Sequence, residues 1–252
     1  MGRFEGRVAL ITGAAQGIGA AFAKGLAAEG AKVAISDLDS GQTVVDIIKQ
    51  QGGDAIDAPC DVSDEASSLA AVKKTAEYFG RLDILVNNAA LFTQIPRASF
   101  DEITVEDWDR VCNVNIRGVW LMCKAAVPEM RKNSYGKIIN ISSGRAFKGS
   151  PDFLHYDASK AAVLGITRSL AREVGDDGIN VNALAPGSTA SENVLARQTD
   201  KGVTMESTIA SRALKRMETP EDLVGACLFL ASSDSDFMTG QSLVVDGGSV
   251  MH

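Results

Sequence analysis

The sequence predicts an α/β protein with one doubly wound, Rossmann-like parallel sheet of about seven strands and helices on both faces. Short β-rich runs alternate with helical patterns along the chain, as expected where right-handed crossovers join parallel strands. Several runs, such as Val8–Ile11 and Ile84–Val86, are entirely apolar. Such runs are typical of strands that are buried on both faces of a sheet.

The elements follow one another in a regular order. The expected strands cover 7–12, 32–36, 54–60, 82–87, 136–142, 179–185 and 241–246. The expected helices cover 17–29, 40–51, 64–79, 104–132, 155–174 and 220–232. This order of strand and helix is what a doubly wound sheet requires.

Residues at the helix ends support these boundaries. Ser63 offers a hydroxyl cap to the helix 64–79, and Pro220 suits the first position of the last helix. Pro128 should kink or shorten the helix that contains it. Three glycines stand where helices should end: Gly30, Gly80 and Gly175.

The chain is expected to form a single domain over 1–252, because it has no linker, repeat or low-complexity tract. The stretch 187–217 is the exception to the alternating pattern, since it mixes polar residues with scattered apolar ones. It would follow the strand 179–185 at the carboxyl edge of the sheet, where ligands bind. We therefore interpret it as an irregular substrate lid.

Composition excludes several classes of function. The net charge of −7 and the pI near 4.9 repel polyanions, which argues against nucleic acid or an anionic membrane as a partner. The N-terminal residues include no apolar signal segment and no window approaches a membrane span of about 18 apolar residues, so a cytoplasmic protein is expected. The 4 cysteines lack C-x-x-C spacing and only 2 histidines accompany them, which favours buried thiols and no metal site.

A glycine-rich turn follows the first strand directly, over Thr12–Gly19. Glycines let a backbone approach a pyrophosphate, whose charge the N-terminus of the next helix favours. Asp37 ends the second strand 18 residues after Gly19, close to the spacing of about 20 for an acid that binds the adenosine ribose. Strand, turn, helix and acid together predict a dinucleotide-binding site.

Asp37 also favours NAD over NADP. Its carboxylate can accept hydrogen bonds from both ribose hydroxyls and would repel the extra phosphate of NADP. No Arg or Lys lies between Gly13 and Gly19 to offset that repulsion. The alternative is that Asp37 caps the following helix, a place that Asp39 or Ser40 could fill instead.

Tyr156 and Lys160 are four residues apart and project from one face of a predicted helix. Tyrosine ionises near pH 10, so a half-ionised phenol at pH 7 needs about 3 pKa units, or roughly 4 kcal/mol. A nearby ammonium and an oxidised nicotinamide both act in that direction. Taken alone, such a pair is usually only part of a helix surface.

Together these motifs resemble the short-chain dehydrogenase/reductase family over essentially the whole chain. Their order and spacing carry the resemblance more than any single motif. The matching residues are Thr12–Gly19, Asp61, Val62, Asn87, Asn88, Ala89, Asn115, Ser143, Tyr156, Lys160, Pro186 and Gly187.

The resemblance implies four catalytic roles. Tyr156 would be the general acid–base, and Ser143 would hold the substrate oxygen. Lys160 would bind the nicotinamide ribose and lower the pKa of Tyr156. Asn115 would hold a water that connects Lys160 to solvent.

The resemblance also implies a cofactor site along the carboxyl edge of the sheet. Asp61 and Val62 would flank the adenine, and Ser191 would offer its hydroxyl to the nicotinamide carboxamide. Ala90 replaces a glycine usual in the family, and we expect only a local shift. The implied cofactor contacts are Gly13, Gln16, Gly17, Ile18, Gly19, Asp37, Asp61, Val62, Asn88, Ala89, Tyr156, Lys160, Pro186, Gly187, Thr189 and Ser191.

The stretches 90–97, 144–154 and 187–217 should line the substrate pocket. Their apolar residues favour a mainly apolar secondary alcohol or ketone, cyclic or aromatic in character. Arg145, with Lys148 nearby, offers a cation for a carboxylate-bearing substrate, although loop cations are more often only solvated. The expected lining residues are Phe92, Arg145, Phe147, Phe153, Val194 and Leu195.

The leading hypothesis is therefore an NAD-dependent secondary-alcohol dehydrogenase. An NADPH-dependent 3-oxoacyl-carrier-protein reductase is the alternative, but its acidic partner would need basic residues near the pocket, and the chain has Asp176, Asp177 and a net charge of −7. A cofactor-binding sensor without catalysis is a third hypothesis, and the complete set of catalytic residues argues against it.

The family usually forms homotetramers through the helices 104–132 and 155–174, so the same is expected here. Each helix carries an apolar stripe that could form the interface, or could equally face the chain's own sheet. The stripes are Val119, Met122, Cys123 and Ala126 on the first helix, and Ala162, Ile166, Leu170 and Val174 on the second.

Overall fold

Seven parallel strands form one sheet in the order β3-β2-β1-β4-β5-β6-β7, which confirms the predicted fold class. The computed structural model describes residues 2–197 and 205–251. The strands are β1 (Val8–Thr12), β2 (Lys32–Ser36), β3 (Ala55–Asp57), β4 (Ile84–Asn87), β5 (Gly136–Ile141), β6 (Ile179–Pro186) and β7 (Ser242–Val245). The strand order reverses between β1 and β4, where doubly wound folds bind their ligands.

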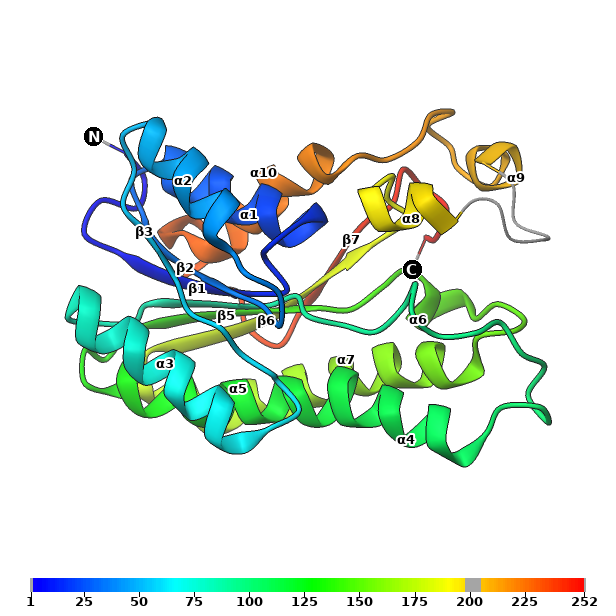
Figure 1. Ribbon diagram of the computed structural model, residues 1–252, viewed down its shortest axis with the longest axis horizontal. Coiled ribbons are helices and arrows are strands. Elements are labelled where there is room, and N and C mark those ends of the chain that lie inside the picture. The colour runs from blue at the N-terminus through cyan, green and yellow to red at the C-terminus, as the bar shows by residue number, and fades with distance from the viewer. Residues whose placement is uncertain (1, 198–204, 252) are drawn as a thin grey trace.

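Helices cover both faces of this sheet (Figure 1). One layer holds α1 (Gly17–Ala28), α2 (Gln42–Gln50) and α10 (Pro220–Ala231). The other layer holds α3 (Glu65–Phe79), α4 (Val105–Cys112), α5 (Gly118–Arg131) and α7 (Leu154–Val174). The shorter segments are the π-helical η1 (Asn113–Arg117), α6 (Arg145–Lys148), η2 (Gly175–Asp177), α8 (Glu192–Arg197), α9 (Met205–Ala210) and η3 (Ser233–Ser235).

Strand β1 shows why its sequence is apolar throughout. Successive side chains of a strand point to opposite faces of the sheet. Ala9 and Ile11 accordingly join the hydrophobic core under α1 and α10, whereas Val8 and Leu10 join the core under α3 and α5. Both faces are buried, so no polar residue alternates with the apolar ones.

Two boundaries on the α3 side differ from the sequence prediction. β3 ends at Asp57 instead of reaching position 60, because Pro59 has no N–H to continue the ladder. The cap of α3 is the Asp64 carboxylate, which accepts a 2.7 Å hydrogen bond from the Ser67 N–H. The predicted hydroxyl cap, Ser63, instead donates to Asp61.

The predicted helix 104–132 is interrupted in a way that the sequence does not indicate. α4 and α5 are joined by the π-helical segment η1, and Pro128 lies inside α5, which continues to Arg131. Pro128 therefore does not shorten the helix, and the kink that it should introduce stays a prediction. α7 does end before Gly175, but the left-handed residue beyond it is Gly178, with φ 72°.

The predicted lid, 187–217, is not wholly irregular. It contains α8 and α9, and residues 198–204 between them lie outside the described residues. Within the described part it approaches the carboxyl edge of the sheet from the side of α10 (Figure 1). The lid therefore borders the edge where the strand order reverses.

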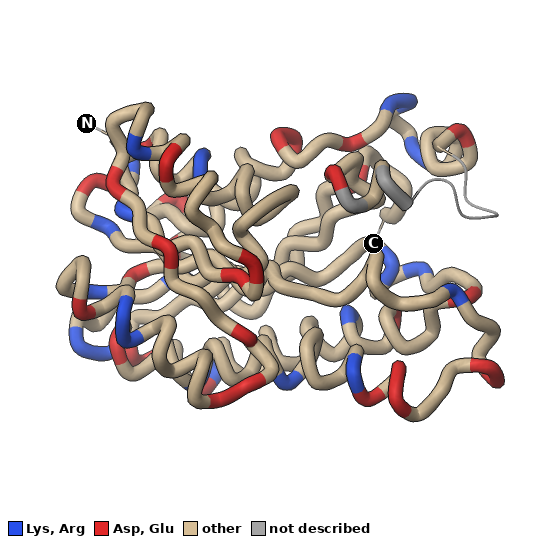
Figure 2. The backbone as a smooth tube through the Cα atoms, viewed as in Figure 1, with Lys and Arg blue, Asp and Glu red and all other residues tan. Residues whose placement is uncertain are grey.

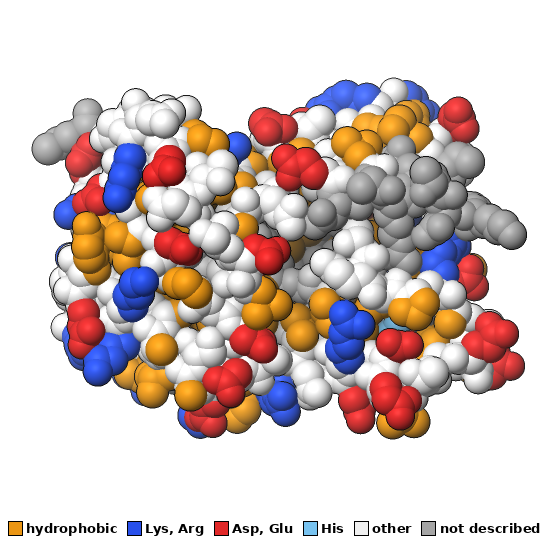
Figure 3. Space-filling view, in the orientation of Figure 1, with side chains coloured by type: hydrophobic (Ala, Val, Ile, Leu, Met, Phe, Trp, Pro, Cys, Tyr) orange, Lys and Arg blue, Asp and Glu red, His pale blue; other side chains and the backbone are white. Residues whose placement is uncertain are grey.

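Charged groups are interspersed along the backbone (Figure 2), and the face in Figure 3 shows no continuous basic surface. No helix in the described ranges is both long and apolar enough to cross a membrane. All four cysteines are free thiols, of which Cys60, Cys123 and Cys227 are buried as predicted, whereas Cys112 is only partly buried. The described residues include no cluster of metal-ligating side chains.

Candidate active site

A cavity of about 800 Å³ opens at the carboxyl edge of β1, β4, β5 and β6. It extends from Asp37 and the glycine turn to Tyr156 and the lid. Most of the predicted site residues line it together, although they come from distant parts of the chain. They are Gly13, Gln16, Gly17, Ile18, Asp37, Asp61, Val62, Asn88, Ala89, Ser143, Tyr156, Lys160, Pro186, Gly187, Thr189 and Ser191.

The glycine turn leaves no room for side chains at its ends. Gly13 and Gly17 have left-handed backbones, with φ of 62° and 58°. A Cβ at Gly13 would lie 2.8 Å from the Cα of Ala89, and one at Gly19 would lie 2.2 Å from the Gly13 carbonyl oxygen. Gly19 is therefore a packing residue beneath the turn and does not line the cavity.

Asn88 fixes the turn to the end of β4. Its side-chain amide donates to the carbonyls of Thr12, at 3.0 Å, and Gly13, at 2.9 Å. The Thr12 hydroxyl accepts from the backbone N–H of Asn88 and of Ala89, both at 3.0 Å. These bonds hold the two strand ends on either side of the point where the strand order reverses.

Asp37 lines the cavity at the end of β2. One carboxylate oxygen accepts from the Ala15 N–H at 2.9 Å, and the other accepts from the Asp39 N–H at 3.3 Å. α2 begins only at Gln42, so Asp37 does not cap it. The alternative of a helix cap is excluded.

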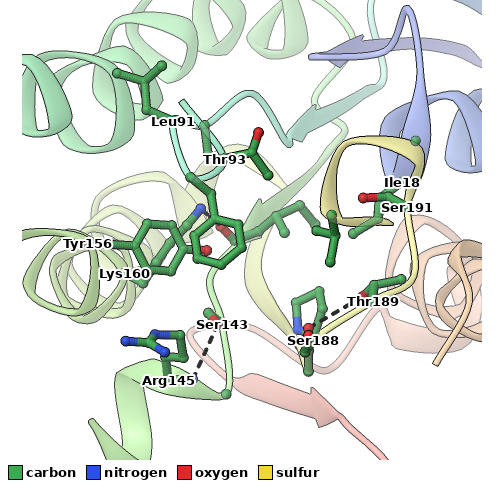
Figure 4. A pocket seen from close by; sticks show the side chains of 18 of the residues that line it. Ile18, Leu91, Thr93, Ser143, Arg145, Tyr156, Lys160, Ser188, Thr189 and Ser191 are labelled. Atoms are coloured by element: carbon green, nitrogen blue, oxygen red, sulfur yellow. Dashed lines mark hydrogen bonds between the residues drawn. The ribbon is translucent and has the colours of Figure 1, made fainter. Parts of the chain in front are cut away.

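Tyr156 and Lys160 are buried on α7 beside the end of β5. The Lys160 ammonium donates to the Ile141 carbonyl at 2.8 Å, and the Ser142 hydroxyl donates to the Lys160 carbonyl at 2.8 Å. The ammonium nitrogen lies 5.8 Å from the centroid of the Tyr156 ring. In Figure 4 the two side chains project into the same part of the pocket.

Burial opposes charge on both of these side chains. It raises the pKa of Tyr156 to about 12, although the Arg145 charge and a hydrogen bond with Ser143 act in the opposite direction. It lowers the pKa of Lys160 to about 8. Burial thus sets the net direction for Tyr156, and the role of Lys160 in lowering the pKa of Tyr156 stays a prediction.

Ser143 is buried directly after β5, and its hydroxyl accepts from the Arg145 N–H at 3.2 Å (Figure 4). The Arg145 guanidinium pairs with Asp157 through contacts of 2.6 and 3.2 Å. Arg145 lines the cavity as predicted, but its charge is already matched by this carboxylate. Its geometry gives little support to a role in binding an anionic substrate.

Asn115 is fully buried on η1 and does not line the cavity. Its side-chain oxygen accepts from the Leu91 N–H at 2.8 Å, and its nitrogen donates to the Leu91 carbonyl at 3.1 Å and to the Ser159 hydroxyl at 3.1 Å. Through Leu91 it fixes the loop that forms one wall of the cavity. Its predicted role in holding a water stays a prediction.

Aromatic side chains form the cavity wall beside Tyr156. The Phe92 ring lies 4.7 Å from the Tyr156 ring and 5.5 Å from the Phe153 ring, measured between centroids. Val194 also lines the cavity. The predicted lining residues Phe147 and Leu195 do not line it: Phe147 is partly buried on α6, and Leu195 is 44% exposed on α8.

Hydroxyl residues that the sequence pattern does not predict as pocket residues also line the cavity. They are Ser207, Thr208 and Ser211 from the lid, and Ser249 near the C-terminus. Arg212 also lines it and forms a buried pair with Glu218 at 3.8 Å. These hydroxyl residues are present in the lid sequence, but their spacing does not distinguish pocket residues from solvent-exposed ones.

The cavity suits an extended dinucleotide. The glycines at one end leave backbone exposed to a pyrophosphate, Asp37 stands where a ribose would end, and the buried Tyr156 and Lys160 stand at the other end. Ala90 lines the cavity without strain, since among the described non-glycine residues only Ser134 and Asp152 have positive φ. The residues present therefore fit a nicotinamide dinucleotide.

Comparison with known proteins agrees with this geometry. A family model described as enoyl-(acyl carrier protein) reductase matches residues 13–250. The chain is 41% identical to galactitol 2-dehydrogenase of Agrobacterium fabrum, with 99% of each chain covered. It is 38% identical to 2-dehydro-3-deoxy-D-gluconate 5-dehydrogenase of Dickeya dadantii, with 97% and 95% covered.

A solved structure of levodione reductase superposes with a TM-score of 0.93 at 32% identity, covering 99% of this chain and 100% of that one. The range 13–250 that the family model matches spans the glycine turn, Tyr156 and Lys160. Relatives of this kind are oxidoreductases, and dehydrogenases of their family use nicotinamide cofactors. The chain belongs to the short-chain dehydrogenase/reductase family.

Proposed function

We propose that the protein is an NAD-dependent dehydrogenase that transfers a hydride between NAD and a secondary alcohol or ketone. The observation that carries this proposal is the buried Tyr156–Lys160 pair beside Ser143, in the same cavity as the glycine turn and Asp37. These groups suit proton transfer at one end of a dinucleotide site. NAD supplies the hydride acceptor when it is bound.

The chain's own residues supply the proton chemistry. Tyr156 takes the alcohol proton during oxidation, and the Ser143 hydroxyl holds the substrate oxygen beside it. Lys160, fixed by the Ile141 carbonyl, binds the nicotinamide ribose. The aromatic rings of Phe92 and Phe153 exclude water from this part of the cavity.

Two chemically different groups of side chains line the substrate pocket. Phe92 and Phe153 offer an apolar face, which supports a substrate with a ring or another apolar face. Ser207, Ser211 and Ser249 add hydroxyl groups, and those of Ser211 and Ser249 lie 3.1 Å apart. A cyclic secondary alcohol with further polar groups fits both groups of side chains, and the names of the relatives, which include a reductase of a dione and dehydrogenases of sugar derivatives, agree with that class.

The alternative remains an NADPH-dependent 3-oxoacyl-carrier-protein reductase. An acidic carrier protein would need basic groups at the pocket entrance. Arg145 pairs with Asp157, and Arg97 pairs with Asp152 at 3.0 Å. These carboxylates weaken the positive potential there and favour the dehydrogenase.

Cofactor preference tests the assignment of NAD. Replacing Asp37 by alanine removes a carboxylate that would repel the 2′-phosphate of NADP. We expect Asp37→Ala to raise kcat/KM with NADP relative to NAD by about tenfold or more, a change of about 1.4 kcal/mol. Asp46→Ala, an exposed acid on α2 away from the cavity, is the matched control. A wild type that already prefers NADP would refute the assignment and favour the reductase.

A further inference from the structure

The entrance of the cavity holds a lysine whose charge no described carboxylate neutralises. Lys148 is the exposed last residue of α6, and it lines the cavity. Each described arginine that lines the cavity has a carboxylate partner. They are Arg97, Arg145 and Arg212, paired with Asp152, Asp157 and Glu218 in that order. Apart from Lys160 of the proposed proton transfer, Lys148 is therefore the one cation in the described lining without a carboxylate partner.

A chain of hydrogen bonds fixes the Lys148 ammonium at this place. It donates to the Ser249 hydroxyl at 2.9 Å, and the hydroxyls of Ser249 and Ser211 lie 3.1 Å apart. Ser211 gives its only proton to the Thr208 carbonyl at 2.8 Å, so Ser249 must donate to Ser211. These residues come from α6, the lid and the C-terminal segment, and all of them line the cavity.

The order of these bonds leaves hydrogen-bond donors on Lys148 alone. An ammonium has three N–H groups, and the Ser249 hydroxyl accepts one of them. The protons of Ser249 and Ser211 are both used within the chain of bonds. Two N–H groups of Lys148 therefore remain for a ligand, and a ligand group that binds to them must be an acceptor.

Asp246 holds the C-terminal segment against the cavity. Its buried carboxylate accepts from the backbone N–H groups of 248–250, at 2.9, 3.0 and 2.9 Å. These three donors also stabilise its negative charge, which would otherwise weaken an anion site here. A Cβ at Gly144 would lie 3.2 Å from the same carboxylate, so the segment packs beside Ser143. In Figure 1 the end of the chain accordingly lies next to α6.

Neither Arg145 nor Arg212 is as available to a ligand as Lys148. The Arg145 guanidinium contacts both carboxylate oxygens of Asp157, at 2.6 and 3.2 Å. The Arg212 side chain is 1% exposed, and it donates to the Ser188 carbonyl at 2.6 Å and to the Arg216 carbonyl at 3.0 Å. Their contacts within the protein leave Lys148 as the cation for an anionic ligand.

We propose that Lys148, anchored by Ser249 and Ser211, binds a carboxylate of the substrate, which makes the substrate a secondary alcohol that bears a carboxylate. One unmatched positive charge suits a monoanion, and the two remaining N–H groups form charge-assisted hydrogen bonds with it. The site lies beside the segment that carries Ser143, so one molecule can reach both. The inference rests on the proposed function, because the hydroxyl that reacts must lie next to Ser143.

The test compares ligands that differ only in charge. 3-Hydroxycyclohexanecarboxylate and its 4-hydroxy isomer are each titrated by calorimetry into the enzyme with NADH bound, so that no alcohol is oxidised. The carboxamide of each acid keeps its shape but carries no charge. We expect the wild type to bind at least one carboxylate about tenfold more tightly than its carboxamide, the difference between a charged and a neutral hydrogen bond.

Variants of Lys148 should remove or keep this preference according to their charge. We expect Lys148→Met to lose the preference while its affinity for the carboxamide stays within twofold of the wild type. Lys148→Arg keeps the charge and should keep most of the preference. Ser249→Ala removes the acceptor that anchors the ammonium, and we expect it to lower the preference about threefold.

Lys215→Met is the matched control, because it removes the same charge from an exposed lysine of the lid that does not line the cavity. Lys215 donates to the Ala210 carbonyl at 2.9 Å, and its replacement should leave the preference for the carboxylate unchanged. An equal loss in Lys215→Met and Lys148→Met would show a general effect of net charge and would overturn the inference.

The outcomes separate this inference from the proposed function. If the wild type binds neither carboxylate more tightly than its carboxamide, or if Lys148→Met keeps the preference, the inference is wrong. Oxidation of the carboxamides by NAD as fast as the carboxylates would contradict the inference and leave the proposed function intact. A wild type that binds no NADH would contradict the proposed function on which the inference rests.

Discussion

Tyr156 and Lys160 occupy an environment that opposes the charged form of each. The pKa of Tyr156 is raised to about 12 and that of Lys160 is lowered to about 8, in both cases chiefly by burial. The site therefore holds a neutral phenol at neutral pH. An oxidised nicotinamide is positively charged, and its charge favours the phenolate when it is bound.

The spacing of Tyr156 and Lys160 could be predicted from the sequence, whereas the direction of the pKa shift could not. The pair is local, since both residues lie on one helix. Their desolvation depends on Phe92, on β5 and on the lid, which are distant in sequence. The same holds for Asp37, whose contact with Ala15 could not be derived from its distance along the chain.

The lowered pKa of Lys160 should appear in the stability of the protein. The unfolded chain keeps this proton up to about its ordinary pKa of 10.5, whereas the folded protein loses it near 8. The unfolded state thus binds more protons between these values, so the wild type gains stability there as the pH rises. Between pH 7 and pH 9.5, we expect the free energy of unfolding of the wild type to rise by about 2 kcal/mol more than that of Lys160→Met.

Urea denaturation of both proteins at the two pH values measures this gain. Lys73→Met is the control, since that lysine is 68% exposed and should show no comparable change. A difference between wild type and Lys160→Met that is independent of pH would contradict a lowered pKa.

The segment η1 is the element whose form departs most from the sequence prediction. The apolar pattern over 104–132 indicates one continuous helix, and the structure inserts a π-helical turn at 113–117. Such turns often occur at functional sites. Nothing in the composition of this segment marks it, because the turn is favoured by the tertiary contacts of Asn115 with Leu91 and Ser159.

Replacing Asn115 should lower the free energy of unfolding more than replacing Asn113, which lies on the same turn. Asn115→Ala leaves the part-buried N–H and carbonyl of Leu91 without this partner, and we expect a loss of about 1–3 kcal/mol in the free energy of unfolding. Asn113→Ala is the matched control, because Asn113 is only partly buried and close to Asn115. Equal losses in urea denaturation of the two variants would show that the Leu91 contacts contribute nothing.

Local chemistry explains which other element boundaries could be predicted. Pro220 does begin α10, and the backbone N–H of Thr219 donates to Asp222 at 2.9 Å. Glycines 30 and 80 have positive φ after α1 and α3, as predicted. These signals depend on neighbouring residues only. The Arg212–Glu218 pair joins a turn to residues far along the chain, and no spacing rule predicts it.

At the scale of the whole molecule, the alternation of strands and helices predicts a doubly wound sheet. It does not predict which apolar side chains of the outer helices are exposed. Val119, Met122 and Cys123 on α5 are buried in the chain's own core, as is Val174 on α7. The stripe on α5 therefore faces the sheet, which was the open alternative, whereas Ala162, Ile166 and Leu170 of the stripe on α7 are only partly buried. The outer side of the same layer exposes other apolar residues, including Trp120 at 51% and Val105 at 72%.

We still predict a homotetramer, and we expect the exposed residues Trp120 and Val105 to lie in its interface. We expect light scattering at micromolar concentration to give the mass of four chains, and Trp120→Glu to reduce it by placing a charge in the interface. Tyr78→Glu, at a residue 62% exposed on α3, is the control. A stable and fully active monomer of 26.5 kDa would contradict the assembly.

The central claim is that Tyr156 carries out acid–base catalysis in an NAD-dependent reaction. The most direct measurement is NADH formation by wild type and Tyr156→Phe over a panel of cyclic and aromatic secondary alcohols, with NAD binding measured alongside. We expect Tyr156→Phe to lose about 10²–10⁴ of the turnover while its dissociation constant for NAD stays close to that of the wild type. Retention of more than about a tenth of wild-type turnover would contradict the claim, because it lies outside that range.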